Sequence, residues 1–333
     1  FFGYSRLMGA MQNLALVGAP LAGVFEKSIP PALHFGRMAA DKDPLRLLRF
    51  ALWCILPFAL AVLLLGANYQ KILTTKRGSA KVRYKARTMK QSPLRFALLR
   101  KELRRFAASP TYMLNTGISL LFVLAVPYFL FGEKTLTQSL ALLGLGPDAL
   151  AALAAAALGL LSASVFISAP SVSLEGSSFW IAQTLPVSAR DILFSKAALH
   201  VCVSLPFLWV SAAIVCLLAR PGIGMGLMLF VFPLAVNVFF ALLGLALNLR
   251  FPKMRWRHET EPVKQSMASF LAMTAGFALV AGLIALYLLA LAPRLSPLVY
   301  LVLCALLFLL GSLLLARRLG KAAQAAFFRL AEA

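Results

Sequence analysis

The side chains that could act as acids, bases or metal ligands are few and widely spaced. The 333 residues include 11 Asp and Glu residues, three His and four Cys. Glu102, Glu175, Asp191 and His258 could converge into an acid–base site, but no spacing between them predicts it. The chain contains no Gly-x-x-x-x-Gly-Lys-Ser/Thr loop for ATP, no His-Glu-x-x-His and no Cys pair at metal-ligand spacing. We therefore predict no catalytic residue, no metal site and no cofactor in this chain.

A polar stretch, SLEGSSFWIAQTLPVSARDILFSK, extends from Ser173 to Lys196 between two long apolar runs. It is too polar to cross a bilayer, although it contains Phe179, Trp180, Ile181 and Leu185. Gly176 can let the chain turn. The pattern over Ser177–Thr184 predicts a short amphipathic helix, which Pro186 would end. The stretch is therefore predicted to begin with a short helix and a break.

A second helix is predicted to begin after this break. Ser188 and Asp191 have the Ser/Thr-x-x-Asp/Glu spacing of a capping box, which would start a membrane-spanning helix from Asp191 onward. A mere connector needs neither the short helix nor the cap. The alternative is an interfacial loop whose Trp and Phe lie at headgroup depth.

These residues resemble the membrane subunit of type-two ATP-binding cassette (ABC) exporters, and in particular bacterial ABC exporter permeases. The shared pattern is Ser-x-Glu-Gly, then Phe-Trp, then Leu-Pro-Val-Ser, and a Lys in the following helix. Lys101-Glu102-Leu103 followed by SPTYMLNT at 109–116 also looks like this family, in which such a half begins with an elbow helix. The resemblance covers residues 94–196 well and the rest only by hydropathy.

The resemblance implies that the polar stretch is cytoplasmic and meets a separate ATPase subunit. That subunit would hold ATP and Mg²⁺, so this chain would be a transport subunit and not an enzyme. The implied coupling residues are Glu175, Gly176, Phe179, Trp180, Leu185, Pro186 and Val187, with Asp191 at the start of the helix that transmits the motion.

Composition predicts an all-α, polytopic transmembrane helical bundle. The chain is 61% hydrophobic and 13% charged, whereas soluble domains are about half apolar. Its net charge of +22 would indicate nucleic acid binding in a soluble protein. Here the basic residues lie beside apolar runs, so the positive-inside rule explains them and no nucleic-acid partner is predicted.

Seven apolar runs have roughly the 20 residues that a transmembrane helix needs. They are residues 50–68, 113–131, 149–170, 192–218, 222–248, 266–292 and 297–316. Because adjacent spans alternate in direction, the loops fall on two sides. The side richer in Lys and Arg comprises 69–112, 171–191, 249–265 and 317–333. The positive-inside rule places this side, with the C-terminus, in the cytoplasm of a bacterial inner membrane, and residues 1–44 outside.

Residues 93–109, PLRFALLRKELRRFAAS, predict an elbow helix in the interface plane. Its apolar face would comprise Phe96, Leu99, Leu103 and Phe106. Its polar residues are Arg100, Lys101, Glu102, Arg104 and Arg105. Membrane lipid is therefore an expected partner. In the loop 250–265, basic residues surround Trp256. We interpret this loop as an interfacial anchor, and contact with a cytoplasmic partner is the alternative.

The predicted organisation has four parts. Residues 1–69 would be an extracellular piece and the last transmembrane helix of a first half, and 70–92 a basic cytoplasmic linker. Residues 93–321 would form a six-helix half with its elbow helix, and 322–333 a cytoplasmic tail. The chain begins with Phe1, so we expect a fragment, a processed chain or the ordered part of a longer one. The missing first half, or a second copy, would complete the bundle.

The preferred functional hypothesis is the permease subunit of an ABC exporter. Acidic residues lie outside the cores of the predicted spans, and only His200 approaches mid-membrane, where ion-coupled carriers usually hold ionisable groups. We interpret His200 as a packed, hydrogen-bonded residue. The alternatives are an ATP-independent carrier or channel and a membrane enzyme of lipid or cell-envelope chemistry. The uncharged spans favour a lipid, an amphipathic peptide or a drug as substrate over a small ion.

Overall fold

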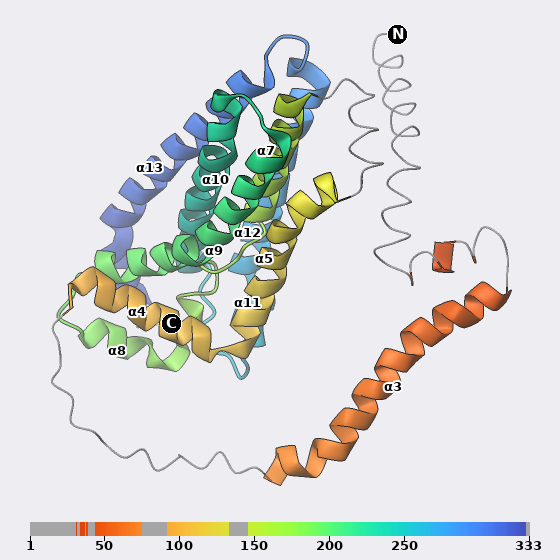
Figure 1. Cartoon of the computed structure of the whole chain (residues 1–333). Coiled ribbons are helices and arrows are strands. Elements are labelled where there is room, and N and C mark those ends of the chain that lie inside the picture. Colours follow the sequence, from red (N-terminus) through yellow and green to blue (C-terminus); the bar gives the residue numbers. More distant parts are fainter. Residues whose placement is uncertain are drawn as a thin grey trace. The chain divides into compact units, whose positions relative to one another are not determined.

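The computed structural model describes residues 31, 34–36, 38, 44–74, 92–132 and 146–330 (Figure 1). Within these ranges all regular structure is helical, as predicted. The chain divides into two compact units, residues 1–91 with 133–142 and residues 92–132 with 143–333. Six of the described helices are long and apolar enough to cross a membrane.

The described part of the first unit is dominated by helix α3, Pro44–Thr74. It contains the predicted span 50–68 and is longer at both ends. None of its side chains over Pro44–Tyr69 is buried. An apolar helix of this kind needs lipid or another protein around it, because its exposed surface is unfavourable in water.

The second unit is a bundle around α10, which is the most buried of the candidate spans. The bundle comprises α5 (Pro110–Phe131), α7 (Pro147–Ser162), α9 (Ala189–Ala219), α10 (Ile223–Arg250), α12 (Met267–Leu286) with the π-helical turn η2 (Tyr287–Leu291), and α13 (Pro297–Arg329). Helix α10 packs against α7, α9, α12 and α13 (Figure 1). Leu158, Leu208, Leu229 and Phe308 lie in the shared core.

The prediction of a continuous span over 149–170 is wrong. Helix α7 has 16 residues and ends at Ser162, so it is about 24 Å long. The following chain is irregular but buried, with Val165 and Ile167 almost inaccessible. Serine hydroxyls compete here with backbone N–H groups for the backbone carbonyls, since Ser164 Oγ donates to Leu161 O at 2.6 Å. Irregular backbone within a membrane bundle is tolerated where protein surrounds it.

Serine caps fix the start of four helices. In each case the serine hydroxyl accepts a hydrogen bond from the backbone N–H three residues later. The capping residues are Ser109 for α5, Ser188 for α9, Ser266 for α12 and Ser296 for α13. The Ser188 cap was predicted, and α9 begins at Ala189, two residues before the expected Asp191.

One end of the bundle holds the short elements: α4 (Leu94–Ala108), the 3₁₀ helix η1 (Ser173–Ser178), α8 (Phe179–Thr184) and α11 (Thr260–Lys264). The last turns of α13 reach the same end (Figure 1). The predicted span 297–316 is therefore the first part of a longer helix. Residues 322–329 continue α13, and Phe327 packs on Phe179 with ring centroids 4.9 Å apart.

Candidate functional site

The first part of the polar stretch, residues 173–187, is called the polar segment. The C-terminal end of α10 holds the start of this segment in place. The Asn248 side chain is fully buried, and its Oδ1 accepts hydrogen bonds from the backbone N–H groups of Val172 at 2.8 Å and Ser173 at 3.0 Å. Asn248 Nδ2 donates to Ser173 Oγ at 2.7 Å. The Lys253 backbone N–H also donates to Ser173 Oγ, at 2.9 Å. Asn248 was not predicted from the sequence, although an Asn near the end of an apolar helix was a possible signal.

Gly176 gives the segment its turn, as predicted. Its backbone has φ +49° and ψ −135°, a combination essentially restricted to glycine. A Cβ there would lie 2.9 Å from Trp256 Nε1 and 3.2 Å from Met254 O. Residues with a Cβ are therefore disfavoured at this position, both by the backbone conformation and by the lack of space.

Trp256 packs against the polar segment. Its indole Nε1 donates to Ser173 O at 2.8 Å, and the residue is partly buried. This contact was not predicted from the sequence. The indole N–H finds its partner in the protein backbone, so it joins the 250–257 loop to η1.

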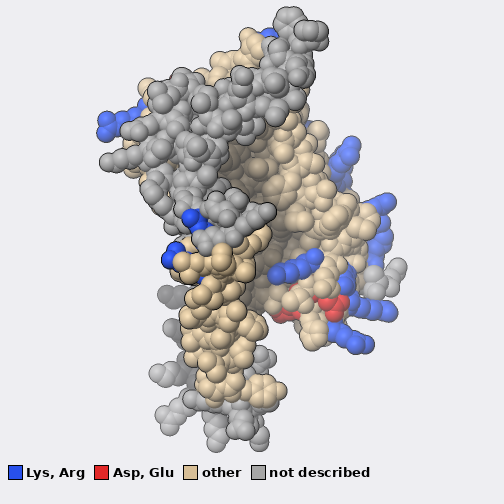
Figure 2. Space-filling view, turned by 90° about the vertical axis from the view of Figure 1, so that its right-hand side faces the viewer, with Lys and Arg blue, Asp and Glu red and all other residues tan. Residues whose placement is uncertain are grey.

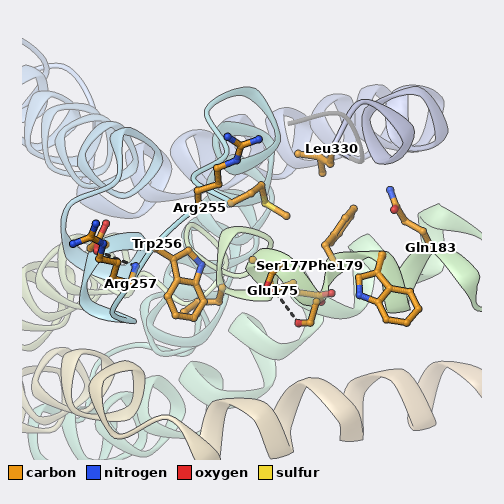
Figure 3. A pocket seen from close by; sticks show the side chains of 14 residues that line it. Glu175, Ser177, Phe179, Gln183, Arg255, Trp256, Arg257 and Leu330 are labelled. Atoms are coloured by element: carbon orange, nitrogen blue, oxygen red, sulfur yellow. Dashed lines mark hydrogen bonds between the residues drawn. The ribbon is translucent and has the colours of Figure 1, made fainter.

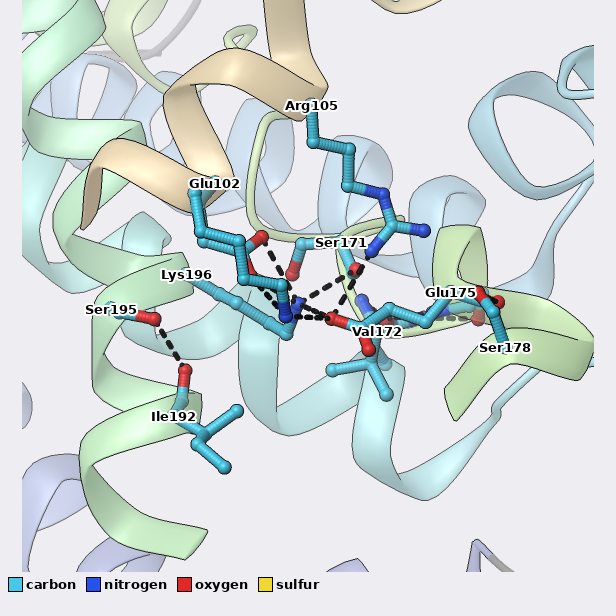
Figure 4. A network of polar contacts seen from close by, with 12 residues as sticks. Glu102, Arg105, Ser171, Val172, Glu175, Ser178, Ile192, Ser195 and Lys196 are labelled. Atoms are coloured by element: carbon cyan, nitrogen blue, oxygen red, sulfur yellow. Dashed lines mark hydrogen bonds and ion pairs between the residues drawn. The ribbon is translucent and has the colours of Figure 1, made fainter. Parts of the chain in front are cut away.

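A buried cluster of charges joins three elements (Figure 4). Lys196 of α9 is fully buried, and its Nζ lies 3.1 Å from both carboxylate oxygens of Glu102 on α4. Nζ also donates to Glu175 Oε1 in η1 and, at 3.4 Å, to Ser171 O. A buried ammonium is strongly unfavourable without such partners, so the cluster holds α4, η1 and the base of α9 in one arrangement.

Two further cations from α4 complete the cluster. Arg105 Nη1 lies 3.1 Å from Glu175 Oε1, and Lys101 Nζ lies 3.6 Å from the same oxygen. Burial alone would raise the pKa of Glu175, but Lys196, Lys101 and Arg105 outweigh it and hold the pKa below its usual value. Glu175 is therefore ionised at neutral pH and cannot serve as a proton donor there.

The predicted apolar face of the elbow helix is divided between the bundle and the exposed surface. Phe106 is buried and Leu99 half-buried, but Phe96 is 58% exposed and Leu103 46% exposed. The face that packs on the bundle comprises Leu98, Glu102 and Phe106, at i, i+4 and i+8. Glu102 can point inward because Lys196 neutralises it, which the pattern of one helix does not reveal. Arg100 and Arg104 remain exposed.

Helix α8 agrees with the predicted short amphipathic helix. Phe179 is buried against Phe327, and Gln183 Nε2 donates to Phe327 O at 2.8 Å. On the other side Trp180 is 61% exposed, and Leu185 and Pro186 are also exposed. Of the predicted coupling residues, Trp180, Leu185 and Pro186 are therefore the ones on the protein surface.

The remaining predicted coupling residues lie behind or beside that surface. Glu175, Gly176 and Phe179 are buried, and Val187 is half-buried. Asp191 lies in the first turn of α9, where Ser188 Oγ accepts from its N–H at 3.1 Å and donates to its Oδ2 at 2.7 Å. The predicted residues therefore comprise an exposed layer, a buried layer behind it, and the partly exposed Val187 and Asp191 beside it.

A groove of about 850 Å³ lies between the polar segment and the 254–257 loop (Figure 3). Phe179, Trp180 and Trp256 contribute aromatic surface to it. Arg255 and Arg257 are exposed residues of the loop side, whereas Glu261 Oε2 is paired with Lys253 Nζ at 3.0 Å. The groove therefore offers aromatic surface with exposed positive charge beside it. Figure 2 shows one face of the molecule, on which acidic side chains occupy a small patch flanked by Lys and Arg side chains.

The four residues considered for an acid–base site do not assemble into one. Glu102 and Glu175 do converge, but on Lys196 in ion pairs. Asp191 Oδ1 instead lies 3.7 Å from Arg95 Nε, and His258 is exposed. Among the described residues, no group of three His, Cys, Asp or Glu side chains could hold a metal ion.

His200 is buried inside the bundle, as interpreted. Its Nδ1 lies 3.2 Å from Ser168 Oγ. Nearby on α10, Asn237 Nδ2 donates to Ser162 Oγ at 3.1 Å and to Ser204 Oγ at 2.8 Å. These bonds connect the end of α7 and the chain after it with α9 and α10, which stabilises the irregular segment after α7.

Comparison with known proteins identifies the family. A family described as membrane proteins of 12 TMs matches residues 42–318. The chain belongs to this family. No curated protein and no solved structure matches the chain. Together with the six candidate spans, the match identifies a multi-pass membrane protein.

Proposed function

We propose that this chain is the transmembrane permease subunit of an ABC transporter that works as an exporter. A separate ATPase subunit would bind ATP and Mg²⁺ and drive it. The observation that carries the proposal is the Lys196 cluster, because it joins the polar segment both to α4 and to the base of α9. A force applied to the polar segment would therefore reach a 31-residue membrane helix directly.

The proposed coupling surface has a stiff support. Trp180, Ile181 and Leu185 are the exposed apolar residues that would contact the ATPase. Behind them, Phe179 packs on Phe327 of α13, and the Ser188 cap begins α9. Because α9 is about 46 Å long, a small rotation at its base would displace its far end. Alternating access to the substrate path would follow from this motion.

The same proposal gives the orientation. The end of the bundle with α4, α8 and α11 would lie on the cytoplasmic side of a bacterial inner membrane, with the C-terminus. Residues 93–321 would form one transmembrane half, and residues 1–69 would end another half. The rest of the first half or a second copy would complete the assembly, and the substrate would be a lipid, an amphipathic peptide or a drug.

Co-purification with an ATPase tests the proposal. The chain would be expressed with the ABC ATPase encoded beside it, in wild-type form and as Trp180→Ala. Trp209→Ala is the matched control, because Trp209 is an exposed Trp within α9, outside the groove. We expect the ATPase to co-purify with wild type and Trp209→Ala, and about tenfold less with Trp180→Ala, as for a central aromatic contact. An ATPase that binds none of the three would overturn the proposal, and substrate flux without it would favour the carrier or channel.

A further inference from the structure

A second groove lies between α4 and α9, and the proposed coupling mechanism does not use it. Its volume is about 530 Å³. Arg95, Phe96 and Leu99 of α4 line one side, and α9 contributes Arg190, Asp191, Phe194, Ser195 and Ala198. None of these residues lines the groove beside the polar segment.

The α9 wall changes from charged to apolar along the helix. Arg190, Phe194 and Ala198 follow each other at i, i+4 and i+8 on one helix face. Because each residue adds about 1.5 Å, Ala198 lies about 12 Å further along the axis than Arg190. The α4 wall also combines a charged residue with apolar ones, since Arg95 is followed directly by Phe96 and one turn later by Leu99. This gradient from charged to apolar matches the profile of a phospholipid.

The charged end of the groove is positive. The Arg190 guanidinium stacks over the Phe194 ring, 5.5 Å from its centroid, and no described carboxylate is paired with it. Arg95 lies 3.7 Å from Asp191 Oδ1, but its side chain is 90% exposed, so that pair is weak. Two arginines and one carboxylate therefore leave an excess positive charge. A guanidinium suits phosphate because it presents several fixed N–H donors.

We propose that this groove binds one anionic phospholipid. Its phosphate would lie between Arg95 and Arg190, and an acyl chain would cover Phe96, Leu99 and Ala198. The occupant also explains why Phe96 is 58% exposed on a helix that packs on the bundle. A lipid that touches both walls would hold α4 against α9 independently of any ATPase.

Lipid binding to the purified full chain tests the proposal. Bound phosphatidylglycerol and phosphatidylcholine would be counted by native mass spectrometry after equal additions to delipidated protein. The test variant is Arg95→Gln with Arg190→Gln. The matched control is Arg100→Gln with Arg104→Gln, which removes the same charge from exposed positions on α4 outside the groove. Thermal unfolding of each protein confirms that it is folded.

We expect wild type and the control variant to prefer phosphatidylglycerol over phosphatidylcholine. Arg95→Gln with Arg190→Gln should lower that preference about tenfold or more, since each basic residue near a membrane surface contributes about 1 kcal/mol toward anionic lipid. Phe96→Ser should weaken binding of both lipids, because it removes acyl-chain contact. Equal binding of both lipids by wild type, an equal loss in the control, or full competition by glycerol phosphate would each overturn the proposal.

Should the glutamine variant fail to fold, Arg95→Lys with Arg190→Lys provides the second test. This variant keeps both charges but loses the planar donor arrangement, so we expect a preference for phosphatidylglycerol that is weaker than in wild type. A preference unchanged from wild type would overturn the role of the guanidinium groups and with it the proposed site.

Discussion

Lys196 and Glu102 are 94 positions apart in the sequence, yet the Lys196 ammonium lies 3.1 Å from both oxygens of the Glu102 carboxylate. Both side chains are buried, and Glu175 shares the same ammonium. The packing of α4, η1 and α9 against one another therefore depends on the charge of Lys196. Removing that charge leaves two buried carboxylates with only the partly exposed Lys101 and Arg105 as partners.

Lys196→Met is expected to destabilise the protein by about 3–5 kcal/mol, because it breaks a buried ion pair from one side. The measurement is the apparent Tm in detergent, read from the monodisperse fraction that survives heating. Lys321→Met is the control, since Lys321 is exposed on α13, and it should change stability by less than about 0.5 kcal/mol. Combining Lys196→Met with Glu102→Gln and Glu175→Gln should recover part of the loss. Equal effects of the two Lys variants would contradict the role of the cluster.

Acid should weaken the same cluster. The pKa of Glu175 is held below its usual value of 4.5, so its ionisation favours the folded state. A depressed pKa contributes stability above the unfolded value, and that stability is lost as the pH falls through the folded pKa. We expect wild type to exceed Glu175→Gln in apparent Tm at pH 7, and the difference to shrink below about pH 4.5. A difference that stays constant from pH 7 to pH 3.5 would show that Glu175 does not act through its charge.

The sequence predicted the parts of the fold that local pattern determines. Apolar runs gave the approximate positions of α3, α5, α9, α10, α12 and α13, because a spanning helix must satisfy its own backbone in lipid. The Ser188 cap and the turn at Gly176 were also predicted, since both follow from residues a few positions apart. The existence of α8 followed from the same kind of pattern.

The features that were not predicted lie where distant residues decide the structure. Glu102 points inward because Lys196 lies on another helix, so the hydrophobic pattern of α4 alone does not reveal which of its faces packs on the bundle. Helix α7 ends at Ser162 and the chain after it is enclosed by protein, which apolar composition does not distinguish from a continuous span. Trp256 donates to Ser173 O, 83 positions away, and no local signal predicts this contact. In each case a tertiary partner overrides the local preference.

Gly176→Ala should distort the polar segment. Alanine at φ +49° and ψ −135° costs about 1–3 kcal/mol in backbone strain, and its Cβ would also lie 2.9 Å from Trp256 Nε1. We expect a lower apparent Tm and faster proteolysis within residues 173–187. Gly282→Ala is the matched control, because a Cβ at Gly282 in α12 meets nothing within 4 Å and alanine is the better helix former. A Gly176→Ala protein as stable as the Gly282→Ala protein would contradict the assignment.

Asn248→Leu should loosen the start of the polar segment without breaking α10, since leucine is a good helix former. The backbone N–H groups of Val172 and Ser173 would lose their buried acceptor, at about 1–3 kcal/mol each. Hydrogen exchange of peptides covering residues 170–180 measures the effect directly.

Asn68→Leu serves as the control for that experiment, because the exposed Asn68 of α3 donates to Leu64 O in its own helix. We expect exchange in 170–180 to accelerate strongly in Asn248→Leu and not at all in Asn68→Leu. If Asn248→Leu leaves this exchange unchanged, the segment is held by Trp256 and the Lys196 cluster alone. If the polar segment has the proposed coupling role, Asn248→Leu should also lower the amount of ATPase that co-purifies. The reason is that a loosened segment should weaken docking even though Trp180 is still present.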